Sequence, residues 1–531
     1  MEQLLKKKKV TSLKNNHLVN WHDLESALHK FKDNTFMTSS IIKLRKNRPA
    51  VLAALLVFCG FIKLYAQDVY LSKVALKEDF EIYKGAITEA HPGLYWYSDT
   101  TEVNDRLAKI ATAIDNTSDQ PGMTQRQFHL YLQEFFAAIR CGHSWMSSPS
   151  SFQEVYNNGP YHFPMRLFTE GDRIFISNVY DSTLSVGVGD EVLSINGMSL
   201  PEIRAAIFPY LPADGYNITS KDHILRNNFL YFYQHYIQLD STLNLQIQSN
   251  GKPNSTVALQ GISKARWQEM RNLATSVKAR EPWLLKYRKL DERTALLSIR
   301  TFSKSWIKGQ QKVKFKRFLK QRFAEINNDG ITKLVLDLRF NGGGDDGAGA
   351  LLARYLINKP FGYFEKMELA TRKFSYLRYS NTHGLKTASL LFKKSKEQPN
   401  TYRWTYHGPL REQKPKKSAF KGQLVVLTNG KTFSTAADVS AVLHANGRAI
   451  FVGEEVGGGY YGNNSAISMD ITLPNSQIQF WIPLVKYTNK VDYPQFYGHG
   501  VIPDHQIPLS FADLQSPEDH ILTKALTFFE D

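Results

Sequence analysis

The stretch that most constrains how this 531-residue chain can fold is residues 424–447, LVVLTNGKTFSTAADVSAVLHANG. Its pattern predicts a buried strand over 424–427, a tight turn at Asn429-Gly430 and a helix over about 434–445. A strand that leads directly into a helix is typical of a sheet covered by helices, which favours the α/β class.

Ser434 falls at the start of the predicted helix. A hydroxyl there projects from a rigid corner, and the free N–H of Thr435 points toward whatever that hydroxyl would attack. The helix dipole favours a developing oxyanion at the same end. Serine is also a favoured N-cap residue, so this stretch alone favours a structural role for Ser434 over a catalytic one.

Length and composition predict a globular protein of two to four domains, with 42% hydrophobic residues to fill their cores. Two cysteines, Cys59 and Cys141, are too few for a fold built on disulfides. The net charge of +17 is uneven, because residues 1–67 hold 12 Lys and Arg against 4 Asp and Glu. The remainder is mildly basic, and the Lys-rich run at 393–417 predicts a solvated loop rather than a nucleic-acid site.

A secretory signal peptide is predicted at residues 49–66, PAVLAALLVFCGFIKLYA, which follow several basic residues and end on the small Ala66. Its apolar run is shorter than the ~20 residues that span a bilayer comfortably. We expect translation to start at Met37, residues 1–67 to be lost, and the mature protein to be periplasmic or extracellular without a stable membrane span. The alternatives are an uncleaved anchor and a lipid anchor on Cys59.

Three regions are expected after the signal peptide. Residues 68–155 read as helical, with helices that end at His91-Pro92 and at Gly142. Residues 156–270 read as short strands and turns. Residues 280–531 alternate strands and helices, and a polar, Lys-rich insertion interrupts them at 361–420. The elements expected there are strands at 295–299, 333–339, 449–453, 471–473 and 477–483, and helices at 310–326 and 348–356.

The second region contains the stretch VGVGDEVLSINGMSL at residues 186–200. Its pattern predicts a strand over 191–195, followed by a hairpin at Asn196-Gly197. The stretch resembles the G-D-x-[IVL]-L-x-[IV]-N-G signature of PDZ modules. That resemblance implies a module that adds a peptide to a sheet edge and holds its carboxylate on backbone N–H groups. Another small β-barrel with an Asn-Gly hairpin is the alternative.

A glycine loop follows the predicted strand in residues 334–356, LVLDLRFNGGGDDGAGALLARYL. It contains a nominal dinucleotide pattern, G-x-G-x-x-G, that begins at Gly342. The acidic pair Asp345-Asp346 inside the loop would repel a pyrophosphate, so we expect no cofactor. The glycines instead let backbone N–H groups approach an oxygen closely, as in an oxyanion hole. Asp337 and Arg339, on the strand, are expected to pair with each other or with neighbours as scaffold.

Three motifs occur in order behind the PDZ-like stretch: D-L-R-F-N-G-G-G, T-N-G-K-T-F-S-T-A-A-D about ninety residues later, and V-G-E-E-V-G-G-G. Together they resemble the C-terminal processing (tail-specific) serine peptidases, whose wider family includes the tricorn core and the retinoid-binding interphotoreceptor protein. The resemblance covers roughly residues 75–510. It implies a crotonase-like α/β protease core, with Ser434 as nucleophile and the N–H groups of Gly343 and Thr435 as the oxyanion hole.

A serine nucleophile needs a base. One branch of the family uses the lysine of a G-E-x-T-x-G-K-G stretch, and Gly459 stands here where that lysine would be. The tricorn-like branch takes a histidine from a G-H-[ST] element upstream of the PDZ unit, which the run CGHSW around His143 resembles. His143 is therefore the expected base, unless it only closes a helix end. The weaker candidates are His91, His444, His499 and His505.

A carboxylate is expected to orient the histidine. The related enzymes place a glutamate shortly before a G-V-x-P-D element, where this chain has Tyr497. Asp492 is the nearest acid and the expected third member, with Asp504 and Glu454 as alternatives. The sequence has no metal-binding pattern such as H-E-x-x-H or C-x-x-C.

The sequence thus predicts an exported serine endopeptidase that cuts unfolded or C-terminally presented polypeptides through an acyl-Ser434 intermediate. One alternative is a catalytically lapsed protein of the same fold that binds peptides or hydrophobic ligands, which the weak acid position and Gly459 favour. Another is an esterase that uses the same serine. We expect polypeptide substrates and no nucleic-acid partner, and the sequence carries no signal of the oligomeric state.

Overall fold

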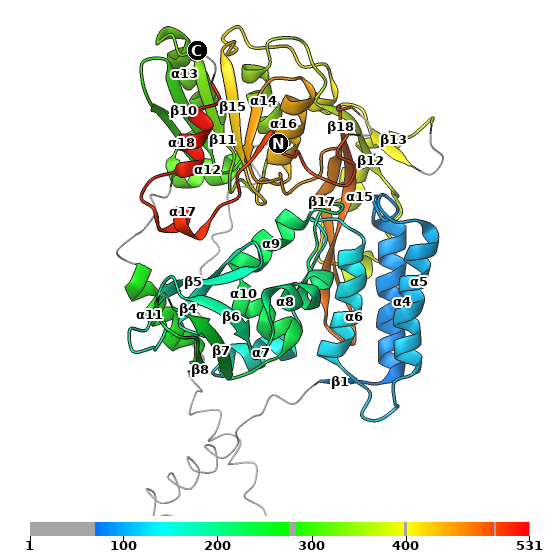
Figure 1. Ribbon diagram of the computed structural model, residues 1–531. Helices are drawn as coiled ribbons and strands as arrows, with labels where there is room; N and C mark the ends of the chain where they lie inside the picture. Colours follow the sequence, from blue (N-terminus) through cyan, green and yellow to red (C-terminus); the bar gives the residue numbers. More distant parts are fainter. Residues whose placement is uncertain (1–68, 250, 276–282, 398–400, 493–494, 530–531) are drawn as a thin grey trace, which may run out of the picture. The chain divides into compact units, whose positions relative to one another are not determined.

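The computed structural model describes residues 69–249, 251–275, 283–397, 401–492 and 495–529 (Figure 1). The chain divides into two units after Tyr65, and all the described residues belong to the unit Ala66–Asp531. The first unit and the predicted signal peptide, with Met37 and Cys59, lie outside the described residues. Within the described part of the chain, no helix is long and apolar enough to cross a bilayer.

A six-stranded sheet with the order β19-β16-β15-β11-β10-β9 forms the centre of the C-terminal region. Its neighbouring strands are parallel, except β9 and β10. Parallel strands that are buried on both faces need nearly continuous apolar sequences, which the LVL run of β11 and the LVVL run of β15 supply. The strands are β9 (Leu285–Lys289), β10 (Thr294–Ile299), β11 (Lys333–Asp337), β15 (Gln423–Thr428), β16 (Ile450–Gly453) and β19 (His505–Gln506).

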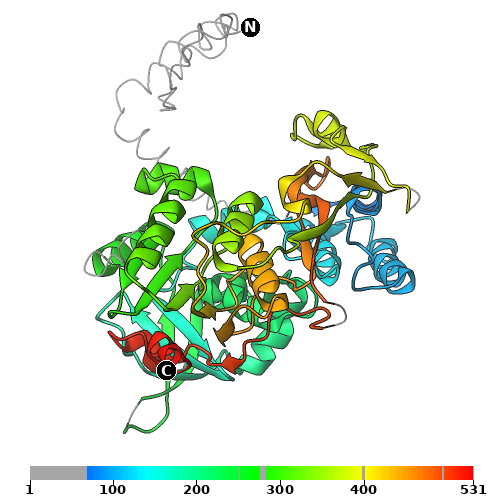
Figure 2. The ribbon, with the colours of Figure 1, turned by 90° about the horizontal axis from the view of Figure 1, so that it is seen from above.

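Alternate residues of β11 face two apolar clusters, one on each side of this sheet. Leu334 and Leu336 join the larger cluster with residues of three helices, which are α13 (Phe315–Asn328), α14 and α16. Val335 joins the smaller cluster with Ile521 and Leu522 of α18 (His520–Leu526). The period of two is that of a strand between two layers of helices, so the mixed α/β class is confirmed. In Figures 1 and 2, α14 (Asp346–Leu356) and α16 (Thr435–Ala445) lie side by side.

A second sheet, which is antiparallel, has the order β13-β14-β12-β18-β17. The short strand β3 (Trp145–Met146) pairs with β18, which ties the segment just after His143 to the C-terminal region. The hairpin of β13 and β14 lies within the run at 393–417, so the loop predicted for that whole run is wrong. The strands are β12 (Phe364–Leu369), β13 (Phe392–Lys394), β14 (Tyr402–Trp404), β17 (Gly462–Thr472) and β18 (Gln479–Asn489).

The N-terminal helices largely follow the sequence pattern. The predicted helix end at His91 is confirmed, and α6 starts after the N-cap Thr124, which forms a capping box with Gln127. The predicted end at Gly142 is wrong, because α6 stops at Ala138 and Arg140 adopts a left-handed φ of 60°. The elements are α4 (Lys73–Ala90), α5 (Thr100–Asp115), α6 (Gln125–Ala138) and α7 (Ser150–Asn158), with a small sheet of β1 (Tyr70–Leu71) and β2 (Met123–Thr124).

The next region is a five-stranded antiparallel sheet, in the order β4-β5-β6-β7-β8, with four helices. The strand predicted at 191–195 is confirmed as β6. Asn196 and Gly197 form a tight turn with φ of 48° and 83°. The turn closes an antiparallel bridge between Ile195 and Met198, as the hairpin signal predicted, but the second arm stops there because a capping box at Ser199 starts α8. The elements are β4 (Met165–Glu170), β5 (Arg173–Val179), β6 (Glu191–Ile195), α8 (Leu200–Ile207), α9 (Ile218–Asn227), α10 (Phe229–Phe232), β7 (Thr242–Gln248), β8 (Ser255–Gln260) and α11 (Lys264–Thr275).

The helix predicted at 310–326 is two helices, α12 (Lys304–Gln311) and α13 (Phe315–Asn328). They separate at Lys312, whose φ of 57° is left-handed. The strand predicted to run to Arg339 ends at Asp337, and the chain turns there into the glycine loop.

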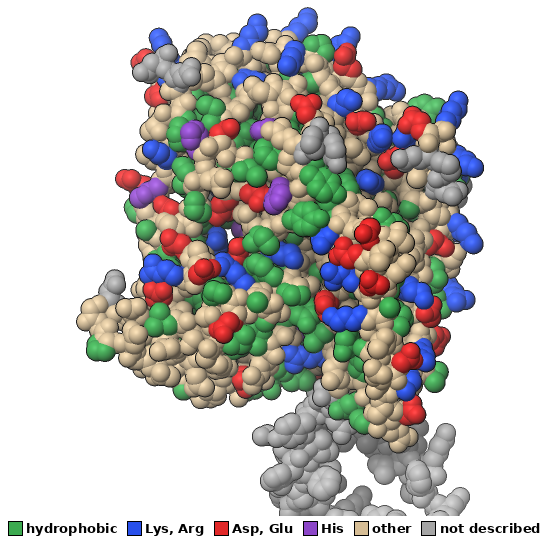
Figure 3. Space-filling model, turned by 45° about the vertical axis from the view of Figure 1, so that its right-hand side comes forward, with side chains coloured by type: hydrophobic (Ala, Val, Ile, Leu, Met, Phe, Trp, Pro, Cys, Tyr) green, Lys and Arg blue, Asp and Glu red, His purple; other side chains and the backbone are tan. Residues whose placement is uncertain are grey.

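Basic side chains are dispersed over the described surface. On the face drawn in Figure 3, Lys and Arg lie among Asp and Glu and form no continuous stripe. Several are paired with acids, such as Lys77 with Asp115 at 2.7 Å. Pairing of this kind gives a mildly basic surface rather than a concentrated positive field.

Candidate active site

Ser434 stands at the N-cap position of α16, at the corner where the chain has left β15. Its backbone has φ 53° and ψ −130°, a conformation that costs a residue with a Cβ roughly 1–3 kcal/mol. The side chain makes no capping hydrogen bond. Its hydroxyl has no hydrogen-bond partner anywhere in the described residues. Ser434 therefore does not serve as a helix cap, and the strained corner presents a free hydroxyl.

Ser434 lines a pocket of about 320 Å³. His143 from the N-terminal region also lines this pocket, as do the glycine loop after β11 and two acidic residues from α14 and α16. This volume lies at the lower end of the range of ligand pockets, which is about 300–1,000 Å³. The lining residues are His143, Gly342, Gly344, Asp346, Phe433, Ser434, Thr435, Asp438, Ser465, Ala466 and Tyr487.

Thr435 supplies a hydrogen-bond donor beside the serine. Its N–H is at the start of α16, where a helix has no internal acceptor for it. Its Oγ1 donates to the carbonyl oxygen of Gly344 at 2.8 Å, which ties the glycine loop to the helix. A donor in this position, at the positive end of the helix dipole, stabilises negative charge that develops next to Ser434.

Gly343 approaches the serine so closely that a side chain would not fit. A methyl group on it would lie 2.6 Å from Cβ of Ser434, and its φ is 97°. However, its N–H donates to Oδ1 of Asn341 at 2.9 Å. The amide of Asn341 is buried and also donates to the carbonyl oxygen of Ile299 at 2.9 Å, so it is fixed in this orientation. The expected oxyanion donor thus lies beside Ser434 but is engaged within its own loop.

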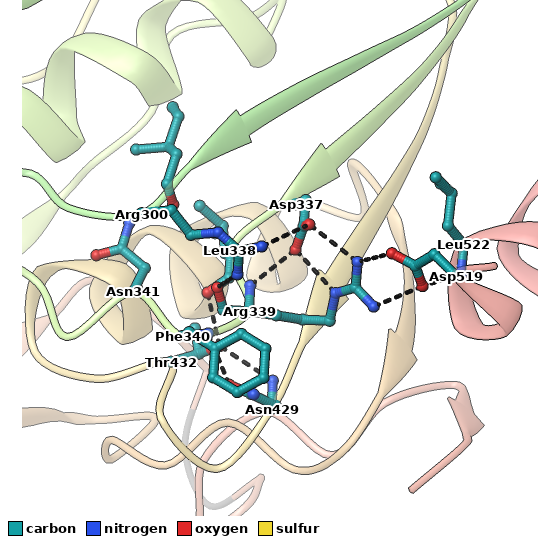
Figure 4. Close-up of polar contacts among 11 residues, drawn as sticks. Arg300, Asp337, Leu338, Arg339, Phe340, Asn341, Asn429, Thr432, Asp519 and Leu522 are labelled. Carbon is teal, nitrogen blue, oxygen red and sulfur yellow. Dashed lines mark hydrogen bonds and ion pairs between the residues drawn. The ribbon is translucent and has the colours of Figure 1, made fainter. Parts of the chain in front are cut away.

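The segment that leads into the glycine loop is held from two sides (Figure 4). Arg339 donates two hydrogen bonds of 3.0 Å to the carboxylate of Asp337, which confirms their predicted pairing. Arg339 also binds Asp519, at the start of α18, at 2.5 Å and 2.9 Å. On the other side, Oγ1 of Thr432 donates to the carbonyl oxygen of Leu338 at 3.0 Å. The loop is therefore joined both to α18 and to the turn before Ser434.

The imidazole of His143 stacks on the ring of Phe433, with 4.6 Å between the ring centroids. Gly142 makes this possible, because a methyl group there would lie 2.7 Å from the Phe433 ring. Burial lowers the pKa of His143 to about 4, so the ring is neutral near pH 7. Its buried Nδ1 has no hydrogen-bond partner among the described residues. The described contacts include no hydrogen bond between His143 and Ser434, although both line the pocket.

Asp214, which sequence reasoning missed, braces the segment that carries His143. Its carboxylate accepts the N–H of Gly142 at 2.7 Å and the N–H of Gly459 at 3.2 Å. Burial raises the pKa of Asp214 to about 6. A Cβ atom at position 459 would lie only 2.7 Å from the carbonyl oxygen of Gly462, so a side chain there is disfavoured. No lysine of the described chain lines the pocket.

The structure does not bring the expected acid to the histidine. Asp492 is exposed and does not line the pocket, because β18 ends at Asn489 and the chain then runs along the surface. The alternative acids also serve elsewhere. Asp504 accepts the N–H of Phe451 at 2.7 Å, and Glu454 accepts backbone N–H groups at 3.3 Å.

The weaker histidine candidates have other partners and do not line the pocket. Their partners are Ser144 for His91, Tyr460 for His444, Glu455 for His499 and Phe528 for His505. Within the described residues, no group of three or more His, Cys, Asp or Glu could hold a metal ion.

Asp346 and Asp438 are the acidic residues of the pocket lining, and sequence reasoning did not single them out as part of the site. Asp438 carried a usable signal, because it follows Ser434 by four residues and so shares its face of the helix. Asp346 was considered only as an argument against a dinucleotide. Its place in the pocket depends on how α14 lies beside α16, which the spacing does not reveal.

Solved structures of CPAF have a similar fold. The structure of mature CPAF complexed with lactacystin aligns with a TM-score of 0.56 at 13% identity, over 83% of this chain and 95% of CPAF. A CPAF mutant aligns with a TM-score of 0.57 at 12% identity, over 86% and 99%. A photosystem II D1 C-terminal processing protease aligns with a TM-score of only 0.38 at 14% identity, over 82% and 92%. No curated protein matches the sequence.

The sequence match to a peptidase family model gives the class of this protein as a serine-type peptidase, a hydrolase. More narrowly, residues 293–507 match the model of peptidase family S41. This match covers the central sheet from the start of β10 to β19, with both the glycine loop and Ser434.

Proposed function

We propose that the protein is an exported endopeptidase that cleaves polypeptides through an acyl-Ser434 intermediate, with His143 as general base. The observation that carries the proposal is the single pocket that Ser434 and His143 share, far apart as they are in the sequence. The strained backbone of Ser434 and its free hydroxyl support a catalytic role, since strain of this kind is concentrated at functional sites.

In the first half of the reaction, Oγ of Ser434 attacks the carbonyl carbon of the peptide and His143 takes the hydroxyl proton. The N–H of Thr435 stabilises the oxyanion. The N–H of Gly343 becomes the second donor when the substrate draws it away from Asn341, since catalytic hydrogen bonds often form only in the complex. Collapse of the tetrahedral intermediate expels the amine, which receives its proton from His143. Water then releases the acyl group by the reverse sequence.

The five-stranded region would present the substrate as a PDZ-like module, and the six-stranded sheet with its helices would form a crotonase-like core. A groove of about 610 Å³ next to β4 supports the PDZ-like assignment. Met165, Arg166 and Leu167 of this edge strand line the groove, together with Arg226. An extended peptide could add to such an edge. The absence of a lysine from the described pocket wall favours the histidine mechanism over Ser-Lys.

Export is proposed from the signal-like segment at residues 49–66. N-terminal sequencing of the protein from its native source tests this directly. A mature start near Gln67 or Asp68 supports export, and a start elsewhere contradicts it.

Peptide cleavage tests the catalytic proposal. A mixture of unstructured peptides is incubated with the purified protein, and the products are identified by mass spectrometry. We expect internal cleavage that falls by at least about 10³-fold in both Ser434→Ala and His143→Ala. Ser440→Ala is the matched control, because this serine lies on the same helix and its hydroxyl only bonds the carbonyl of Ala436. Turnover of esters without any peptide cleavage would indicate an esterase instead.

A further inference from the structure

The pocket beside Ser434 is acidic. Two of its lining side chains are carboxyl groups, Asp346 at the start of α14 and Asp438 on α16. No Lys or Arg of the described residues lines it. The imidazole of His143 is neutral near pH 7 and does not compensate these groups. A substrate group that enters this pocket therefore meets two carboxyl groups next to the nucleophile, one of which is bonded by His407 from outside the pocket.

Asp438 lies deep in the pocket and is only 3% exposed. Its Oδ1 accepts a hydrogen bond from the side-chain amide of Asn463 at 3.1 Å. Asn463 accepts in turn from the hydroxyl of Ser465 at 2.5 Å, so a lining serine fixes the amide. Burial raises the pKa of Asp438 well above its ordinary value, and the charge of Asp346 adds to this shift. A cation in the pocket would stabilise the ionised form of Asp438.

Asp346 is less buried, with 24% of its side chain exposed. Its Oδ2 accepts from the hydroxyl of Tyr487 at 3.4 Å and lies 2.9 Å from Nε2 of His407. Burial raises the pKa of Asp346, but the hydrogen bond and charge of His407 outweigh burial and leave the pKa below its ordinary value. The pocket thus offers one carboxylate that is ionised near pH 7 and a second that a cation would ionise.

We propose that this pocket selects a Lys or Arg side chain of the substrate, at the residue whose carbonyl group Ser434 attacks. The inference rests on the proposed function and adds its substrate class, which is polypeptides cut after a basic residue.

The geometry of α16 fits a long side chain. Asp438 follows Ser434 by four residues, which corresponds to about 6 Å along a helix, and both residues line the same pocket. The stem of Lys or Arg covers such a distance and carries its charge at the end. An uncharged side chain of the same length would fill the space but leave the carboxyl groups without a cation, which disfavours it.

Matched peptides that differ only before the cut bond test the proposal. One carries arginine and the other citrulline, which has nearly the same shape without the charge. We expect kcat/KM of the wild type to be at least about tenfold higher for the arginine peptide. In Asp438→Asn and Asp346→Asn the ratio of the two kcat/KM values should move toward one, because kcat/KM should fall more for the arginine peptide than for the citrulline peptide. Asp345→Asn is the matched control, since Asp345 pairs with Lys304 at 3.2 Å outside the pocket and the ratio should stay unchanged.

Equal rates for the two peptides in the wild type would overturn the proposal. The proposal would also be overturned if, in both Asn variants, kcat/KM fell by the same factor for the arginine and the citrulline peptide. The acids would then position catalytic groups rather than select the substrate. Calorimetric binding of the same peptides to Ser434→Ala separates this inference from the proposed function. Tighter binding of the arginine peptide supports the selective pocket even if the wild type cuts neither peptide. Equal binding overturns the selective pocket even if the wild type is an active peptidase.

Discussion

Around the pocket of Ser434, three residues occupy positions that only their surroundings can maintain. Ser434 has a φ of 53°, which a residue with a Cβ rarely adopts. Gly343 and Gly142 touch Ser434 and Phe433 so closely that even a methyl group would collide. The site is therefore assembled by backbone approach as much as by side chains, and the free hydroxyl of Ser434 is a consequence of that assembly.

In the proposed mechanism, the burial of His143 sets the acid limit of activity. A general base must be neutral, and the pKa of His143 in the free protein is about 4. We therefore expect kcat/KM to fall with decreasing pH only as the pH approaches about 4, and not near the ordinary histidine value of about 6.5. Initial rates on a peptide without titratable groups, measured across this range, test it. A half-loss of kcat/KM near pH 6.5 in the folded protein would contradict the buried base.

Sequence reasoning found Ser434 and His143 because each lies in a short motif whose neighbours take part in the same local structure. It did not find Asp214, whose bonds reach Gly142 and Gly459 across 72 and 245 residues. It placed Asp492 by its proximity along the chain, and the structure turns that side chain to solvent. Contacts between distant segments carry no periodic signal, so the partners of a catalytic residue are harder to predict than the residue itself.

Among the elements, the central strands were the most predictable and the peripheral ones the least. The strands β11 and β15 are continuous apolar runs, which few other structures could bury. The strands β13 and β14 are three residues each and half polar, so a loop was the natural expectation. The break between α12 and α13 at Lys312 is marked by neither Gly nor Pro. The glycine loop is held to the C-terminal helix by the Asp337–Arg339–Asp519 ion pairs.

The two acids that bind Arg339 should differ in their effect on stability. The side chain of Asp337 is 4% exposed and that of Asp519 is 42% exposed. Asp337→Ala leaves the buried guanidinium of Arg339 with one weaker partner, and should lower the free energy of unfolding by roughly 3–5 kcal/mol. Asp519→Ala removes a more exposed pair and an N-cap, and should cost about 1–2 kcal/mol. Thermal or urea unfolding measures both, and a larger loss for Asp519→Ala would contradict this ranking.

At the scale of the described part of the molecule, three regions of the chain meet at one site. His143 comes from the helical region, Asp214 from the region of the five-stranded sheet, and Ser434 from the central α/β region. The sequence predicts the order of these regions along the chain, but it does not predict that they meet at one site. Their packing also buries several histidines without hydrogen-bond partners among the described residues, notably His129 and His235, whose rings lie 5.3 Å apart.

Because these histidines are buried, we expect the free energy of unfolding to fall as the solution becomes acidic. Burial lowers the pKa of His129 to about 3, and burial followed by the charge of His129 lowers the pKa of His235. The unfolded chain takes up their protons below about pH 6.5, so stability is complete above that pH and is lost as the pH falls toward the folded-state values. Each such histidine should account for about 2 kcal/mol between pH 7 and pH 5.

Urea unfolding of the wild type and of His235→Phe at the two pH values tests this. His235 lies 4.2 Å from the ring of Phe152, so a phenyl ring is compatible with its surroundings. The acid-induced loss of stability should be smaller by about 2 kcal/mol in this variant. The same replacement at the exposed His383 should leave the loss unchanged. An equal loss in His235→Phe and the wild type would show that other groups govern the acid sensitivity.

The central claim, an activated Ser434 with His143 as its base, is tested most directly by fluorophosphonate labelling followed by mass spectrometry of the intact and digested protein. We predict a single adduct on Ser434 in the wild type and in Ser440→Ala, none in Ser434→Ala, and labelling at least about 10²-fold slower in His143→Ala. Folded wild-type protein that takes no label would contradict the account and favour a lapsed protein that only binds its ligand. Labelling at the wild-type rate in His143→Ala would keep the nucleophile and refute the base.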